Sequence, residues 1–393
     1  MNILMVAAVD PVEPNASVLH ISSLAEAFAV AGHHVEVVLP APPQGMKPAI
    51  SGESGYSLWF CSYSAMLRMP RVLSPILFAP MIVWHAWCTR VDLIYVRSAT
   101  MTWFLTLLCR LMTRAFVITE HNGWIHDEII SLTASGATVA RCASLFQTID
   151  AGASHGVRAV TAGLAEVLAE KGVNRNRISV IGNGTNIHRF FPMARTVALA
   201  KRSLPDDAFY LGFIGNLAPW QGVDLVIEAL PAIRAIHPAV RLIIAGSGPE
   251  LTKLKEKAAA LGIAEAVIFF GSVPLSEANM VVNCFDLAVA PFTTGRNCRI
   301  GLSPLKIRDY AAAGRAILAA DIAGISTLDR EPWLALFAPE SVADFASRAI
   351  ELIRDPDHLT RLGLAARRHA EQEFDWSCIA AKILLMLRPK MSD

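Results

Sequence analysis

The chain contains 393 residues, of which 53% are hydrophobic and 18% charged, and its formal net charge is only +1. This length favours two domains, and the composition is typical of a well-packed or membrane-proximal protein. A charge balance so close to zero provides no long-range field for a polyanion, so nucleic acid is not an expected partner. Any anionic ligand has to be bound by local donors.

The seven cysteines are scattered, without a CxxC pair or a spacing typical of a metal site, which indicates reduced thiols. The N-terminal sequence MNILMVAAVD has no basic leader and no cleavage site, and its apolar run is only as long as a strand. We therefore expect a cytoplasmic protein.

The first half of the chain alternates strand and helix patterns. Residues 2–8 form an almost continuous apolar run, a helical repeat of apolar residues covers 18–28 and stops at Gly32, and 35–39 has the pattern of a second strand. Buried strands joined through a helix by short connections predict a parallel, right-handed unit. Further strands are expected at 92–96, 116–119 and 158–161.

The second half repeats this order. Strands are expected at 210–214, 241–245, 267–270 and 287–290, with a helix at 223–236. We therefore predict an α/β fold with two Rossmann-like, doubly wound parallel-sheet domains that face each other across a cleft. Ligands of such sheets lie beyond the carboxyl ends of the strands, so each domain is expected to offer one substrate.

Turn-forming chemistry marks the junction between the two domains, because GNGTN at 182–186 is followed by Pro192. We expect a first domain at residues 1–192 and a second at 193–375. A C-terminal helix within 376–393 is expected to pack back on the first domain.

Two apolar segments, 72–87 and 101–112, are too short or too interrupted by proline to be good spanning helices. One interpretation is that both cover the N-terminal sheet. The other is a peripheral contact with the inner face of a membrane, because basic residues beside apolar stripes favour anionic interfaces. The basic residues concerned are Arg68, Arg71, Arg110 and Arg114.

A short helix is predicted to begin at Ser303. Ser303 is a good N-cap residue, Pro304 suits the first helical position, and Gly314 is a natural terminator. The free amides and positive dipole end of such a helix form an anion site that a diphosphate can occupy without metal.

Lys306 and Asp309 are three residues apart and therefore share one face of this helix. The lysine can neutralise phosphate, and the carboxylate can accept hydrogen bonds from ribose hydroxyls. The alternative is an ordinary solvated ion pair between the two side chains, which is common on helices.

Three small-residue turns follow predicted strands of the second half on the same edge. The first contains Gly215, Asn216 and Gln221, the second begins at Gly246, and the third contains Ser272 and Val273. Glycine there lets the backbone approach an extended ligand. The alternative is that the glycines serve packing alone.

In the first half, Glu120, His121 and Asn122 follow a predicted strand end. An imidazole at that edge can donate to, or exchange a proton with, a sugar hydroxyl or a phosphate oxygen, with Glu120 or Asn122 orienting it. The alternative is a structural histidine. Asp127 and Glu128 can meet acceptor hydroxyls or simply begin a solvated helix.

Taken together, these stretches resemble the family 4 retaining glycosyltransferases of the GT-B fold. The resemblance is carried by GHHV at 32–35, IGNGTN at 181–186 with Phe191 and Pro192, the loop from Gly215 to Asp224, GSGP at 246–249, and SPLKIRDYAAAG at 303–314. It covers nearly the whole chain and concerns the fold and the donor side more than the acceptor.

The resemblance implies transfer of a sugar from a nucleotide-diphosphate sugar to an acceptor hydroxyl, with retention and without a metal or other cofactor. It places the acceptor on the N-terminal domain and the donor on the C-terminal domain. Its implied catalytic residues are His121, Lys306 and Asp309. Its implied donor-binding residues are Gly215, Asn216, Gln221, Gly246, Ser272, Val273, Arg299, Ser303, Pro304 and Leu305. Its implied acceptor-binding residues are Asn15, Ser17, Glu120, Asn122 and Asp127.

The chain departs from the family pattern where charge matters. Asn216 and Gln221 stand in place of arginine and lysine, and Gly301 and the shorter Asp309 in place of two glutamates. Asn15-Ala16-Ser17 replaces a glycine-rich loop. The expected diphosphate site therefore has few positive charges unless they are supplied by Arg296, Arg299 or Arg308.

Two alternatives to an active transferase stay open at this point. One is a partner subunit or glycan-binding scaffold without turnover, and the other is a sugar-nucleotide epimerase on the same fold. The acceptor is expected to be sugar-containing, and the apolar region 58–87 indicates a hydrophobic or lipid-linked one.

Overall fold

The computed structural model describes residues 1–12, 16–42, 45–48, 55–61, 74–132, 136–295, 299–325 and 333–388. Contacts divide the chain into two compact units. One is Met1–Asn183 together with Trp376–Asp393, and the other is Gly184–Asp375. The boundary expected at residue 192 falls inside the second unit, because Arg367 donates to the carbonyls of Ile187 and Phe190 and holds this segment there.

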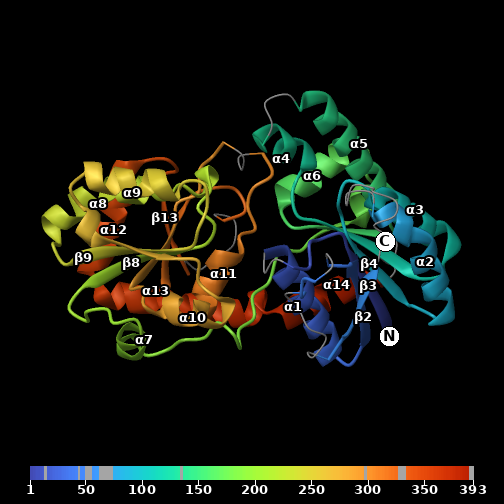
Figure 1. Ribbon diagram of the computed structural model, residues 1–393, viewed down its shortest axis with the longest axis horizontal. Coiled ribbons are helices and arrows are strands. Elements are labelled where there is room, and N and C mark those ends of the chain that lie inside the picture. Colours follow the sequence, from blue (N-terminus) through green and yellow to red (C-terminus); the bar gives the residue numbers. More distant parts are fainter. Residues whose placement is uncertain are drawn as a thin grey trace. The chain divides into compact units, whose positions relative to one another are not determined.

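Seven parallel strands form the sheet of the first unit, in the order β3-β2-β1-β4-β5-β6-β7. Their bounds are β1 Asn2–Ala7, β2 His34–Pro40, β3 Ser57–Cys61, β4 Leu93–Arg97, β5 Phe116–His121, β6 Gly156–Ala159 and β7 Ile178–Val180. The helices are α1 Ala16–Val30, α2 Ser74–Cys88, α3 Thr102–Met112, α4 Ile125–Leu132, α5 Ala137–Ala153, α6 Ala162–Glu170 and α14 Trp376–Leu385. Helices α1 and α14 pack together, as do α2 and α3 (Figure 1).

The second unit has a sheet of six parallel strands in the order β10-β9-β8-β11-β12-β13. Their bounds are β8 Phe209–Ile214, β9 Val240–Ala245, β10 Val267–Gly271, β11 Leu287–Ala290, β12 Ala316–Ala320 and β13 Ala335–Phe337. The helices are α7 Arg195–Lys201, α8 Val223–Ile236, α9 Leu251–Ala260, α10 Leu275–Asn283, α11 Leu305–Ala312, α12 Val342–Arg354 and α13 Pro356–His369. In Figure 1, α8 and α9 lie on one face of this sheet and α10 and α13 on the other.

The prediction of two doubly wound parallel sheets is confirmed. Their central strands are fully buried because helices cover both faces, which is why they are almost entirely apolar. Strand order reverses between β1 and β4 in one sheet and between β8 and β11 in the other. These two switch points open at the carboxyl ends of the strands, where ligands of such sheets bind.

Several elements differ from the sequence prediction. The strand expected at 158–161 is Gly156–Ala159, two residues earlier, because the strand begins at a glycine that strand propensity disfavours. The strands β3, β7, β12 and β13 were not predicted. The strands β7 and β13 have only three residues, and β12 is rich in alanine, so these three carry no strong strand pattern.

The apolar segment at 74–88 is a helix with two different faces. Phe78, Ile82 and Val83 of α2 are buried in the core of the first unit, as the sheet-covering interpretation predicts. On the other face, Trp84 and Trp87 are 65% and 64% exposed. Among the described residues, no helix combines the length and the apolar character that crossing a bilayer requires.

A buried carboxyl joins α5 to α3. Asp150 is fully buried and accepts hydrogen bonds from the hydroxyls of Ser98 at 2.6 Å, Thr102 at 3.0 Å and Thr106 at 2.5 Å. Burial raises the pKa of Asp150 to about 6, although the hydroxyl donors oppose this shift. The folded state therefore binds this proton more tightly than the unfolded chain does.

We predict that Asp150→Asn changes how stability depends on pH. Because the folded pKa of the carboxyl exceeds the unfolded value, ionisation destabilises the native protein progressively from about pH 4 to pH 6. Relative to the natural protein, the variant is expected to gain about 3 kcal/mol in unfolding free energy across this interval. Urea unfolding at several pH values measures it. If the unfolding free energies of the two proteins change with pH in parallel, the proposed ionisation of the buried Asp150 is contradicted.

Candidate active site

Three loops meet at the carboxyl edge of the second sheet. They follow β8, β9 and β10, whose last residues lie in register. The loops are joined by backbone hydrogen bonds from Gly215 to Ala245, from Leu217 to Ser247, and from Gly246 to Gly271, at 2.9, 2.9 and 2.6 Å. Three turns far apart in sequence thus form one continuous rim.

Two glycines of this rim are required by close approach. Gly215 and Gly246 have φ values of +144° and +139°, which side-chain-bearing residues rarely adopt. A Cβ on Gly246 would lie 1.9 Å from the carbonyl oxygen of Gly215, and one on Gly215 would lie 3.0 Å from Nζ of Lys306. The glycines therefore do serve packing, and Gly215 also makes room for the lysine.

Helix α11 begins at Leu305. Its N-cap position is Pro304, not Ser303 as predicted, because Pro304 has extended geometry with ψ 130° and lies outside the helix. Proline has no side-chain group that could accept from the helix amides, so the N-cap residue itself makes no capping hydrogen bond. The hydroxyl of Tyr310 accepts from the amide of Ile214 and so ties the helix to the end of β8. The free amides at such a helix end favour an anion.

Lys306 lies at this helix end against aromatic rings. Its Nζ is 3.7 Å from the ring centroid of Phe213 and 5.3 Å from that of Phe292, and it donates to Oε1 of Gln221 at 2.6 Å. Burial lowers the pKa of Lys306 well below its ordinary value. No carboxylate of the described residues pairs with it. A desolvated cation with only a neutral hydrogen-bond partner is suited to an anionic ligand.

Asp309 is not the ion-pair partner of Lys306, so the alternative of an ordinary surface pair is wrong. Its Oδ1 instead accepts from the hydroxyl of Thr185 at 2.6 Å. Although part of its surface is exposed, burial raises the pKa of Asp309 to about 7, against the opposing effects of Thr185, Arg189 and Arg308. Lys306 and Asp309 thus face different surroundings from one short helix.

The remaining donor-side residues lie around the rim. Asn216 and Ser272 are exposed, Val273 is half-buried, and Arg299 is exposed next to residues outside the described part. Leu305 is half-buried at the first turn of α11.

The arginines that were expected to supply positive charge to the diphosphate lie in different places. Arg308 is 3% exposed, and its guanidinium lies 4.9 Å from the ring centroid of Phe374 and donates to the carbonyl of Pro304. It is therefore held inside the unit. Arg296 lies outside the described residues.

His121 ends β5 of the first unit and is fully buried. Its Nδ1 is 3.3 Å from Nε2 of Gln147, and its Nε2 is 3.1 Å from the hydroxyl of Thr119. Because the amide of Gln147 donates, Nδ1 accepts and Nε2 carries the proton. Burial lowers the pKa of His121 to about 4, so the imidazole is neutral at physiological pH.

Glu120 is the common hydrogen-bond acceptor of a buried polar network. Its carboxylate accepts from five side chains, which belong to His20, Tyr95, Arg97, Asn122 and Arg158. Burial raises its pKa, but His20 and the two guanidinium groups outweigh this effect and hold the pKa well below its usual range. A carboxylate saturated in this way is a positioning group, and it has little capacity left for an acceptor hydroxyl.

The other acceptor-side residues have diverse partners. Ser17 accepts from Arg97 at 3.1 Å, Asn122 donates to Glu120, and Asp127 accepts from the neighbouring His126 at 3.0 Å. Asn15 and the side chain of Glu128 lie outside the described residues.

Sequence reasoning missed the partners that shape both sites. Arg158 is fully buried and donates to the carbonyls of Ile181 and Gly182 as well as to Glu120. An arginine inside a predicted apolar strand was the available signal. For Phe213 and Thr185 no signal in the sequence pointed to Lys306 and Asp309.

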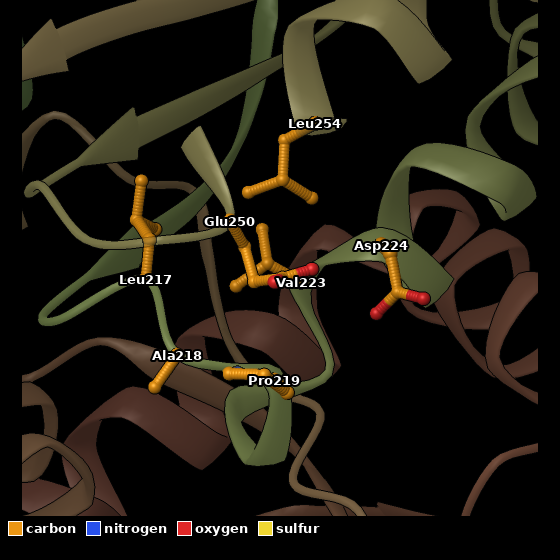
Figure 2. Close-up of a pocket in the computed structure, with 7 residues that line it drawn as sticks. All are labelled: Leu217, Ala218, Pro219, Val223, Asp224, Glu250 and Leu254. Atoms are coloured by element: carbon orange, nitrogen blue, oxygen red, sulfur yellow. The ribbon is translucent and has the colours of Figure 1, made fainter. Parts of the chain in front are cut away.

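A small pocket lies beside the rim, between the loop after β8 and the first turns of α8 and α9. Figure 2 shows its lining residues, which are Leu217, Ala218, Pro219, Val223, Asp224, Glu250 and Leu254. Its volume of about 90 Å³ is far below the several hundred Å³ of a typical ligand pocket. It therefore adjoins the rim but is too small for a nucleotide.

Both halves of the chain match known families. Residues 17–184 match the family described as Glycosyl transferase 4-like domain, and residues 208–355 match that described as Glycosyl transferases group 1. The chain is 32% identical over 221 residues to a D-inositol 3-phosphate glycosyltransferase of Nocardia farcinica, covering 54% of this chain and 48% of that protein. It is 30% identical over 205 residues to a glycogen synthase of Mycobacterium tuberculosis, covering 52% and 46%. It thus spans about half the length of these curated relatives.

Solved structures show the same fold. The sucrose-phosphate synthase from Thermosynechococcus elongatus superimposes with a TM-score of 0.79 at 16% identity, covering 98% of both chains. HepE from Anabaena, solved in complex with UDP, gives a TM-score of 0.75 at 19% identity, covering 98% of this chain and 99% of that one. The chain thus has a 4-like glycosyltransferase domain at residues 17–184 followed by a group 1 glycosyltransferase domain at 208–355, on the two-sheet GT-B fold of these structures.

Proposed function

We propose that the chain transfers a sugar from a nucleotide-diphosphate sugar to an acceptor hydroxyl, with retention of anomeric configuration and without metal. The observation that supports this proposal most directly is which groups surround Lys306. Its ammonium group has no carboxylate partner within the described part of the chain, and it lies at the N-terminus of α11, beside loops that approach closely through glycine. These are the properties of a diphosphate site.

In the proposed reaction the acceptor oxygen bonds to the anomeric carbon while the bond from that carbon to the diphosphate breaks. The departing diphosphate stays on the same face of the sugar and takes the acceptor's proton. Lys306 and the amides of α11 stabilise the charge that grows on the leaving group. Asp309 accepts from the ribose. His121 is neutral, and in this proposal its Nε2–H exchanges the bond to Thr119 for one to the sugar or phosphate.

Relatives and structural neighbours support the substrate classes. HepE was solved with UDP, and a second HepE structure holds UDP-glucose. The curated relatives named above are a glycosyltransferase of inositol 3-phosphate and a glycogen synthase. We therefore propose a nucleotide sugar as donor and a sugar-containing or hydrophobic acceptor.

The test is incubation with a panel of UDP-, GDP- and ADP-sugars, in which nucleoside diphosphate release is followed with and without EDTA. Release that chelation leaves unchanged is the expected result. Epimerised donor without acceptor would favour the epimerase. If all donors stay intact and none binds, the scaffold alternative holds and the proposal fails.

We predict that Lys306→Met weakens binding of the nucleoside diphosphate about 10- to 100-fold, the range for losing a charge-assisted contact. Calorimetric titration measures the affinity. The matched control is Lys253→Met, because Lys253 is a 71% exposed lysine of α9 that pairs with Glu250. Equal affinities for the two variants would remove Lys306 from the donor site.

We predict that His121→Ala slows transfer about tenfold or more but leaves nucleotide affinity within about twofold. Because the pKa of His121 is about 4, its titration should produce no transition in the rate profile between pH 5 and 9. Turnover and affinity are measured side by side across this range, with His34→Ala, an exposed histidine, as control. A loss of affinity as large as the loss of rate would contradict a role in transfer.

We also propose that the exposed apolar residues of α2 and α3 contact an anionic membrane surface. This α2–α3 surface consists of Met81, Trp84, Trp87, Leu111 and Met112, which are 45% to 72% exposed. The indole of Trp87 donates to the carbonyl of Met112 at 2.6 Å and joins the two helices. Two tryptophans beside aliphatic residues are typical of side chains that settle at a bilayer interface.

The charges around this surface favour anionic lipid. Helices α2 and α3 contain no aspartate or glutamate, while Arg110 belongs to α3 and the exposed Arg90 and Arg114 follow α2 and α3 directly. Basic residues near a membrane surface are attracted to acidic headgroups. Such a contact would bring the chain to a lipid-linked acceptor.

We predict that Trp84→Ala weakens binding to phosphatidylglycerol vesicles about 10- to 100-fold, because burying one large side chain is worth on the order of 1.5 to 3 kcal/mol. Co-sedimentation measures it, with phosphatidylcholine vesicles as the uncharged comparison. Leu364→Ala is the control, since Leu364 is a 59% exposed apolar residue of α13 in the other unit. Equal sedimentation of both variants would overturn the proposed contact.

A further inference from the structure

Thr185 is a buried residue with three separate contacts in the second unit. Its side chain is 2% exposed, and its hydroxyl donates to Oδ1 of Asp309 at 2.6 Å. Its amide donates to the carbonyl of Phe374 at 2.7 Å, and it forms an isolated parallel bridge with Asp375. One threonine therefore connects α11 to the segment around 374–375.

These contacts lie where the chain passes between its two units. The first passage is between Asn183 and Gly184, one residue before Thr185. The second is between Asp375 and Trp376, directly after the bridge partner of Thr185. The carboxyl of Asp309 thus accepts a hydrogen bond from Thr185, the residue that connects the two passages through its bridge to Asp375.

The hydrogen bond leaves half of the carboxyl group available. Oδ1 of Asp309 is occupied by Thr185, whereas Oδ2 has no hydrogen-bond partner among the described residues. The charges that act on the group come from Arg189, in the segment after the first passage, and from Arg308 on its own helix. The hydroxyl therefore fixes the carboxyl in an orientation that keeps one oxygen open.

We propose that Thr185 is a positioning residue for Asp309. Its effect on nucleotide binding rests on the proposed function, because it requires Asp309 to accept from the nucleotide. Thr185 itself touches no substrate in this scheme. It acts by orienting the carboxyl and by favouring its charged form.

The chemistry of the pair predicts a distinctive pH dependence. A hydroxyl donor stabilises the carboxylate, whereas burial stabilises the protonated acid, and the balance places the pKa of Asp309 at about 7. Removing the hydroxyl should raise that pKa. If it rises by about one unit, the ionised fraction at pH 7 falls about fivefold, while at pH 9 it is almost unchanged.

The experiment compares Thr185→Val, which keeps the shape but not the hydroxyl, with Thr185→Ser, which keeps the hydroxyl. Affinities for UDP, GDP and ADP are measured between pH 6 and 9. For the diphosphate that the natural protein binds, Thr185→Val should bind about fivefold more weakly at pH 7 and recover by pH 9. Thr185→Ser should follow the natural profile. If Thr185→Val does not fold, Thr185→Ala takes its place.

A second measurement needs no nucleotide. The unfolding free energy of each variant is followed against pH, with Asp309→Asn as the reference that lacks the ionisation. Thr185→Val should shift the Asp309-dependent part of the curve upward by about one pH unit.

The outcomes separate the two proposals. Unshifted pH curves for Thr185→Val, or weakening by the same factor at every pH, would overturn the positioning role. If the natural protein binds none of the three nucleotides, the proposed function fails, while a shifted stability curve for Thr185→Val still supports the positioning of Asp309 and an unshifted one overturns it.

Discussion

A cation withdrawn from water needs compensation, and Lys306 finds none in the described protein beyond an amide oxygen and aromatic rings. An ammonium group in such surroundings is costly to keep charged, which is why its pKa is depressed. The nearby helix end adds further positive potential. In the second unit the charged form of Lys306 is therefore unfavourable without an anion beside it, and a diphosphate would supply the compensating negative charge.

In the first unit, by contrast, the buried charges are compensated by other protein groups. There Glu120 is surrounded by donors, and Arg158 uses its remaining hydrogens on backbone carbonyls. Such a network is internally satisfied, so it fixes the end of β5 without attracting a ligand. His20, which belongs to the network, also packs against Trp376 at the start of α14, with ring centroids 4.7 Å apart and the ring planes tilted by 57°. The contrast separates a network whose charges are balanced by protein groups, next to His121, from the surroundings of Lys306, where the described residues provide no carboxylate.

Local propensity explains how far α11 could be predicted. Residue types that favour helix starts predicted a helix here, but it begins at Leu305 and not at Pro304, because Pro304 has extended geometry and takes the N-cap position. The departures at Asn216 and Gln221 predicted a loss of charge in the phosphate loop. Gln221 in fact accepts from Lys306 and holds the remaining cation in place.

By itself, the sequence determined the alternation of buried strands and helices, the two parallel sheets and the rim of glycine turns, because these depend on patterns within short windows. Tertiary structure alone decided which partners each charged group has. Lys306 and Asp309 are neighbours on one helix, yet one meets Phe213 and the other meets Thr185, 124 positions away. No periodic pattern encodes such pairings, since they arise only when distant strand ends and loops are brought together by folding.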